Sequence, residues 1–197
     1  MNIDLIKIMY LFFRLSPIII VSYFALSSIF NQDLKGIVYL GGLLLTCLIV
    51  HTIWSTFSGD VNPNQPLGHC GLTFMGINNT PFSNVPLGLT TLAYTLGYIG
   101  TFIGIQKLAH INIPTLIILP LLVVVEAMFL FNQSCNSPNS IGLAIVGGGG
   151  LGLLWALIIN ENNIQELKMY TGISSSQVCS RPTKKDYKCV KKPNLAL

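Results

Sequence analysis

Residues 114–131 read PTLIILPLLVVVEAMFLF and contain a single charged side chain, that of Glu126. A helix that crosses a bilayer needs roughly 20 mainly apolar residues, because each residue advances the helix axis by about 1.5 Å. In the lipid interior no water is present to pair with backbone N–H and C=O groups, so a helix, which pairs them internally, is the expected structure. This stretch therefore predicts a transmembrane helix.

Similar apolar stretches occur along the first 159 residues, and they occupy residues 9–30, 36–57, 87–105 and 141–159. Charged residues make up only 9% of the chain, whereas about a quarter is usual in soluble proteins. We expect an all-α fold: a polytopic transmembrane helix bundle of about five spans over residues 1–159. A long loop, 58–86, interrupts it, and a tail, 160–197, follows it.

The basic residues are concentrated in the tail, which holds seven of the 11 in the chain against three of the seven acidic residues, so that it carries the whole net charge of +4. Cytoplasmic segments of membrane proteins are enriched in Lys and Arg, so this asymmetry predicts a cytoplasmic tail. With five spans, the connections containing Lys35 and Lys107 lie on the same side as the tail. The 58–86 and 132–140 loops, which lack Lys and Arg, lie on the other side.

Each of these two loops holds one cysteine, Cys70 or Cys135. The predicted topology places both on the non-cytoplasmic, oxidising side, so a disulfide between them is one interpretation and two free thiols the other. Cys179 and Cys189 in the tail form a second candidate pair. Because the tail is predicted to face a normally reducing compartment, a bridge there would need an oxidation system.

Ionisable residues inside the predicted spans are Arg14, His51 and Glu126, and such residues are functional candidates because charge is costly in a bilayer. Under the five-span topology they lie at a similar depth near the non-cytoplasmic face. One hypothesis is a proton relay through Glu126 and His51. The alternative, which we favour, is a structural ion pair between Arg14 and Glu126. We expect the middles of the other spans to be bare of polar groups, which argues against a transport path.

Two glycine pairs at four-residue spacing, Gly100 with Gly104 and Gly148 with Gly152, predict close contacts between helix backbones. The second pair overlaps a run of four glycines at 147–150. That run lacks the Lys-Ser/Thr of a phosphate-binding loop, so it predicts a close helix crossing or a kink.

One part of the chain is similar to an enzyme family. Cys70, followed by Ser83-Asn84-Val85-Pro86-Leu87-Gly88-Leu89 and a span with Tyr94, resembles the cysteine loop and following helix of vitamin K epoxide reductase relatives. That family carries out thiol–quinone exchange with a membrane C-x-x-C pair, and only Cys135 stands where the pair is expected. A thiol-redox membrane enzyme or a small membrane transporter is therefore the alternative function.

Residues 179–189 read CSRPTKKDYKC. This segment resembles the C-terminal Cys-Ser-Arg-Pro-Ser/Thr-Lys-x-x-Phe/Tyr-Lys/Arg-Cys segment of small multi-span membrane proteins of large icosahedral DNA viruses. In those viruses an internal lipid membrane underlies the capsid, and such proteins are virion membrane or minor capsid components. The resemblance implies a structural protein in a virion internal membrane or a host-derived assembly membrane, with no catalytic residue to transfer.

We therefore expect a non-enzymatic protein, without cofactor or metal, that anchors an internal viral membrane to the capsid shell. Its expected partners are the lipid bilayer, anionic lipid heads, and capsid or other virion proteins, with no specific nucleic acid. Each Lys or Arg near an anionic membrane surface contributes about 1 kcal/mol. The residues expected to contact shell or lipid are Arg181, Lys184, Lys185, Lys188, Lys191 and Lys192.

The topology can be tested with protease added to the cytoplasmic face of sealed vesicles. We expect cleavage beyond about residue 161 and protection of the spans and of the 58–86 loop, because the tail carries the excess of basic residues. Mass spectrometry of the protected fragment gives the cleavage site. Cleavage within 58–86 with an intact tail would show that the orientation is inverted.

Overall fold

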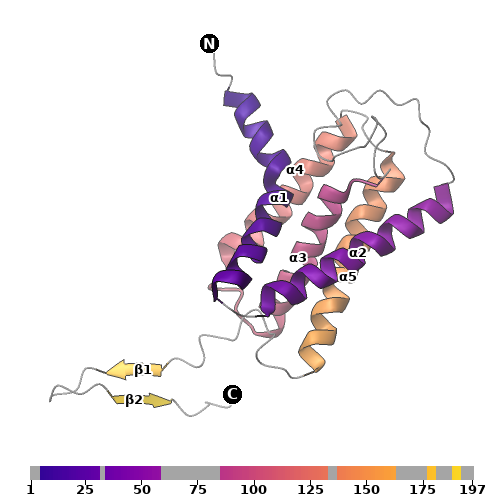
Figure 1. Cartoon of the computed structure of the whole chain (residues 1–197). Coiled ribbons are helices and arrows are strands. Elements are labelled where there is room, and N and C mark those ends of the chain that lie inside the picture. The colour runs from indigo at the N-terminus through magenta and orange to yellow at the C-terminus, as the bar shows by residue number, and fades with distance from the viewer. Residues whose placement is uncertain are drawn as a thin grey trace.

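The computed structural model describes residues 5–31, 34–58, 85–132, 137–162, 177–180 and 188–191, and the side chains of most of the helical ones. The helices are α1 (Leu5–Asn31), α2 (Lys35–Ser58), α3 (Leu87–Ile105), α4 (Ile113–Asn132) and α5 (Pro138–Glu161), and they pack together as a bundle (Figure 1). Two short strands, β1 (Gln177–Ser180) and β2 (Lys188–Lys191), lie in the tail. Each helix contains its predicted apolar segment whole, so the predicted helical membrane bundle is confirmed.

Four of the described helices, α2 to α5, are long and apolar enough to cross a membrane. In α1 the corresponding apolar stretch is the shorter Leu15–Phe30. The protein is therefore membrane-embedded, while a crossing by α1 remains a prediction.

Helix α3 lies at the centre of the bundle and contacts each of the other four helices. Its residues from Leu89 to Thr95 are buried without interruption, as expected for a helix covered on all sides. By contrast, α1, α2, α4 and α5 expose many large apolar side chains, such as Phe30, Leu44, Ile117 and Val146. These outward side chains form the surface that faces lipid.

The most extensive contact between helices joins α3 to α5, and it depends on glycine. A Cβ atom at Gly148 would lie 2.7 Å from the carbonyl oxygen of Thr90, and one at Gly152 would collide with the carbonyl oxygen of Tyr94. From the other helix, a Cβ at Gly97 would collide with the carbonyl oxygen of Gly149. The backbones therefore touch directly, which confirms the predicted close crossing at the glycine run.

The same contacts give the relative direction of the two helices. Thr90 meets Gly148 and Tyr94 meets Gly152, so the residue numbers increase together along both helices. Helices α3 and α5 consequently run parallel, and α4, which comes between them in the chain, runs back in the opposite direction (Figure 1).

The prediction of a close contact between helix backbones was wrong, within this chain, for the pair Gly100 and Gly104. A Cβ atom at Gly100 or Gly104 would have nothing within 4 Å. The glycine-mediated contact with α5 extends along α3 only as far as Gly97, so these two positions lie beyond it.

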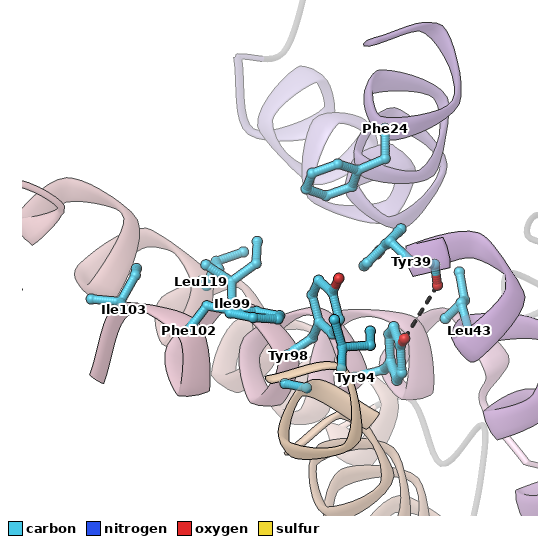
Figure 2. Packing of buried hydrophobic residues seen from close by; sticks show 11 residues of the cluster. Phe24, Tyr39, Leu43, Tyr94, Tyr98, Ile99, Phe102, Ile103 and Leu119 are labelled. Carbon is cyan, nitrogen blue, oxygen red and sulfur yellow. Dashed lines mark hydrogen bonds between the residues drawn. The ribbon is translucent and has the colours of Figure 1, made fainter. Parts of the chain in front are cut away.

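An aromatic cluster joins α1, α2 and α3 next to this crossing (Figure 2). The ring of Tyr39 lies 4.3 Å from that of Phe24 and 5.4 Å from those of Tyr94 and Tyr98, measured between centroids. Tyr39, Tyr94 and Tyr98 are fully buried. Aromatic pairs at such separations add to the stabilisation from burial alone.

Hydrogen bonds orient this cluster. The Tyr94 hydroxyl donates to the Tyr39 carbonyl at 3.2 Å, the dashed line in Figure 2. The Thr95 hydroxyl donates to the Thr91 carbonyl at 2.7 Å, so the Tyr39 hydroxyl is the donor in its 2.6 Å bond to the Thr95 Oγ1. The Trp155 indole N–H of α5 donates to the Val38 carbonyl at 3.1 Å. Helices α2, α3 and α5 are thus linked by polar groups inside the apolar bundle.

The glycine crossing can be tested by Gly152→Ala, with Gly100→Ala as the matched control. The added methyl group at 152 must push α5 away from the α3 backbone, and overpacking of this kind costs about 1–3 kcal/mol. At 100 the methyl group has free space, so the free energy of unfolding should be unchanged or slightly higher. Unfolding in mixed micelles by SDS titration, followed by circular dichroism, gives both values. Equal destabilisation by the two substitutions would contradict the assigned crossing.

Candidate functional site

Glu126 is the charged residue that the structure places most clearly inside the bundle. It lies in α4 and its side chain is only 3% exposed. Its Oε1 atom would be 3.9 Å from a Cβ atom at Gly88, in the first turn of α3, and that Cβ would lie 3.4 Å from Cγ of Pro17 in α1. The Glu126 carboxyl group is therefore held where α1, α3 and α4 meet.

The beginning of α3 offers a favourable electrostatic environment for a carboxylate. Pro86 precedes the helix with extended backbone angles, and its own side chain makes no capping hydrogen bond to the first turn. The free N–H groups of a helix N-terminus carry a partial positive charge that stabilises a nearby anion. Because Gly88 has no side chain, the Glu126 carboxyl group can approach this turn. The partial positive charge at the beginning of α3 therefore helps to offset the cost of burying the Glu126 carboxyl group inside the bundle.

Arg14 belongs to the same region by its position in the chain. It precedes Pro17 by three residues in α1, which is about one helical turn. The backbone thus brings Arg14 to within one turn of the residue that lies beside Gly88 and Glu126. The side chain of Arg14 lies outside the described residues, so its ion pair with Glu126 remains a prediction.

His51 lies in the C-terminal half of α2 and is half-buried. The preceding residue, Val50, is fully buried and packs against α5 at Gly147, whereas the following residues of α2 are largely exposed. Since α2 crosses the bundle obliquely (Figure 1), its C-terminal end extends away from the core. The proposed relay between His51 and Glu126 remains a hypothesis.

The expectation that the middles of the other spans are bare of polar groups was wrong for α3, where Thr95 is buried midway along the helix. Among the described residues, buried hydroxyl groups occur in four helices, at Ser16, Ser28, Thr46, Thr90, Thr91, Thr95 and Ser140. Several of them donate to the carbonyl four residues earlier in their own helix, as Thr91 does to Leu87 at 2.9 Å. This pairing satisfies each hydroxyl locally. These groups stabilise the helices in lipid and do not by themselves define a transport path.

The tail contains a second candidate site, which is formed by two short strands. These strands were not predicted from the sequence. Strands β1 and β2 pair antiparallel with Val178 opposite Val190 and Cys179 opposite Cys189 (Figure 1). Val is favoured in strands, and the β2 lysines stand opposite uncharged partners, Lys188 opposite Ser180 and Lys191 opposite Gln177. Like charges opposite each other would weaken the pairing. The tail therefore contains a β-hairpin with basic residues in its second strand.

The remaining predicted site residues lie outside the described part of the chain. They are Cys70 and Cys135 of the two loops, together with Arg181, Lys184, Lys185 and Lys192 of the tail. The disulfide predicted between Cys70 and Cys135 is therefore still a prediction. Of the described residues with known side chains, Cys47 is a free cysteine, in α2.

No protein-family model, curated protein or solved structure matches this chain. The resemblance of the tail to viral membrane proteins thus rests on its own residues, and the features that bear on function are the Glu126 site and the tail hairpin.

The aromatic cluster around Tyr39 was not predicted from the sequence. A signal was present in α3, where Tyr94 and Thr95 lie three and four residues after Thr91 and four and three residues before Tyr98. Such spacing places side chains on one helix face. What the spacing could not give is the partner, because Tyr39 lies 56 residues before Thr95 in the chain.

The predicted ion pair can be tested by Glu126→Gln and by the double variant Arg14→Met, Glu126→Leu. Removing one partner of a buried pair leaves an uncompensated charge, which often costs 3–5 kcal/mol, whereas replacing both with apolar residues is often neutral. We expect Glu126→Gln to lower the free energy of unfolding and the double variant to recover most of the loss, measured by SDS titration. A stable Glu126→Gln protein that has lost proton-coupled transport in liposomes would favour the relay.

Proposed function

We propose that the protein is a structural integral membrane protein that anchors a lipid bilayer to a surrounding protein shell, as a membrane or minor capsid component of a virion does. The observation that carries the proposal is the tail. It concentrates the whole net charge of +4 and contains a β-hairpin, β1–β2, at the segment that resembles the viral proteins.

The charge of the tail supports an attachment role. Apart from the tail, the chain has four basic and four acidic residues and is electrically balanced. A folded element with several cations attracts acidic protein surfaces and anionic lipid heads, and it orients the encounter before contact. In this proposal the helices fix the tail to the bilayer and the hairpin meets the shell.

The packing of the helices also supports a structural role. The two core clusters are built from large apolar side chains of all five helices, and α3 and α5 touch through their backbones. In lipid such close packing is a main source of helix association, because lipid tails are as apolar as the helices themselves. A closely packed bundle suits an anchor, which must resist being pulled apart.

A proton-coupled transporter is the second candidate function, and one observation favours it. Glu126 is a buried carboxyl group in a membrane helix, and such groups often carry protons in transporters. Its position beside α3 and α1 would allow a change of protonation to alter the packing of three helices. The enzyme alternative depends on Cys70 and Cys135, which lie outside the described residues.

The anchor proposal can be tested by deleting residues 174–197 and by changing Lys184, Lys185, Lys188, Lys191 and Lys192 to Gln together. The matched control changes the same five residues to Arg, which keeps their charge. We expect the deletion to leave membrane insertion intact but to give particles whose shell is absent, incomplete or detached from lipid, as seen by electron cryomicroscopy.

The Gln variant should weaken attachment of shell to membrane, and the Arg variant should preserve it. In the unmodified protein the attachment should fall as salt rises, since charges are screened beyond about 8–10 Å near physiological ionic strength. Intact particles with the truncated protein at normal copy number would refute the anchor and leave the helix bundle as the functional part.

A further inference from the structure

The register of the tail hairpin brings two cysteines opposite each other. Cys179 in β1 and Cys189 in β2 are direct partners in the antiparallel pair. Directly opposed residues in such pairs have Cα atoms about 4.5–5.5 Å apart. A disulfide requires Cα atoms about 4.4–6.8 Å apart, so the backbone already meets this requirement.

The hairpin also needs an additional constraint to persist in water. Its strands are four residues long, and the described sheet has two strands. A two-stranded hairpin on its own is at best marginally stable. A covalent link between Cys179 and Cys189 would close a loop of 11 residues, 179–189, and thereby remove most of the open conformations. By the chain-entropy relation, such a loop favours the closed form by roughly 100-fold.

We propose that Cys179 and Cys189 form a reversible intramolecular disulfide that locks the tail hairpin. The oxidant is a low-molecular-weight disulfide such as glutathione disulfide. The thiolate of one cysteine attacks a sulfur of glutathione disulfide and releases one glutathione thiolate, which leaves a mixed disulfide on the protein. The second cysteine thiolate then attacks the protein sulfur of that mixed disulfide and releases the second glutathione. Two protein thiols are oxidised and one glutathione disulfide is reduced to two thiols.

The lock would change how the basic residues between the cysteines are presented. The basic residues within the 11-residue loop are Arg181, Lys184, Lys185 and Lys188. In the oxidised form they belong to a closed loop whose ends are fixed, and in the reduced form to a chain that opens readily. Ordering a binding segment in advance lowers the entropy lost on binding. The proposal concerns the covalent state of the hairpin and holds whether or not the tail attaches to a shell.

The first experiment uses the full chain in lipid nanodiscs, equilibrated with reduced or oxidised glutathione and then alkylated. Mass spectrometry of the non-reduced digest should show a cross-linked peptide joining Cys179 to Cys189 in the oxidised buffer and two alkylated cysteines in the reduced buffer. Cys47→Ser is the control, and the cross-link should be unchanged by it because Cys47 lies within α2. Hydrogen exchange at 177–180 and 188–191 should slow by up to about 100-fold on oxidation.

Two further variants test the register itself. The double variant Val178→Cys, Cys179→Ser moves the thiol of β1 from position 179, which is opposite Cys189, to position 178. Because neighbouring residues of a strand point to opposite faces of the sheet, this thiol would lie on the other face from Cys189. The cross-link should be lost. Adding Val190→Cys with Cys189→Ser places both cysteines at the opposed positions 178 and 190, and the cross-link should return.

Three results would overturn the proposal. They are free thiols at both positions in the oxidised buffer, stable glutathione adducts that do not close to a protein disulfide, and cross-links to another cysteine or another chain. None of these bears on shell attachment, which is measured on particles with the deletion and charge variants, so the two proposals fail separately.

Discussion

The direct contact between the α3 and α5 backbones is the constraint on which the rest of the bundle depends. It exists because Gly97, Gly148 and Gly152 lack side chains at the crossing. In a bilayer there is little hydrophobic drive to bring helices together, so close van der Waals contact must provide much of the association. Once α5 lies against α3, the indole of Trp155 reaches the Val38 carbonyl of α2. The position of α2, and with it the Tyr39 contact to Thr95, follows from the same crossing.

Gly42 in α2 extends this dependence to a third helix. A Cβ atom there would collide with the Tyr94 hydroxyl and the Trp155 indole nitrogen. The absence of a side chain lets these two polar groups from different helices come close to the α2 backbone. Tyr94 can then donate to the Tyr39 carbonyl, and Trp155 to that of Val38. Small residues thus determine both where the helices touch and which polar groups meet.

The helices could be predicted from the sequence because apolar length is a local property, and α3 begins and ends at the predicted residues, Leu87 and Ile105. Partners could not be predicted, because contacts such as that of Tyr39 with Thr95 depend on which helices become neighbours. The glycine pairs show the same limit: Gly148 and Gly152 lie at a crossing, whereas Gly100 and Gly104 do not. In the tail, the basic charge was evident, but the hairpin was not, since four-residue strands with one apolar pair give little periodicity. The grouping of Arg14, His51 and Glu126 by depth stays a prediction, and the structure adds that Glu126 is buried where α1, α3 and α4 meet.

The composition of α3 has a consequence for how the chain enters the membrane. It is the least apolar of the four long membrane helices, because it contains threonines, tyrosines and glycines, several of which, such as Thr95, Tyr94 and Gly97, serve contacts inside the bundle. A segment with few strongly apolar residues partitions weakly from the translocon into lipid on its own. During synthesis α2 is made before α3 and already offers Tyr39, whereas α5, the main partner of α3, is made after it. Stable insertion of α3 is therefore expected to begin beside α2 and to be completed only when α5 arrives, so that biogenesis of this protein includes an assembly step within the bilayer.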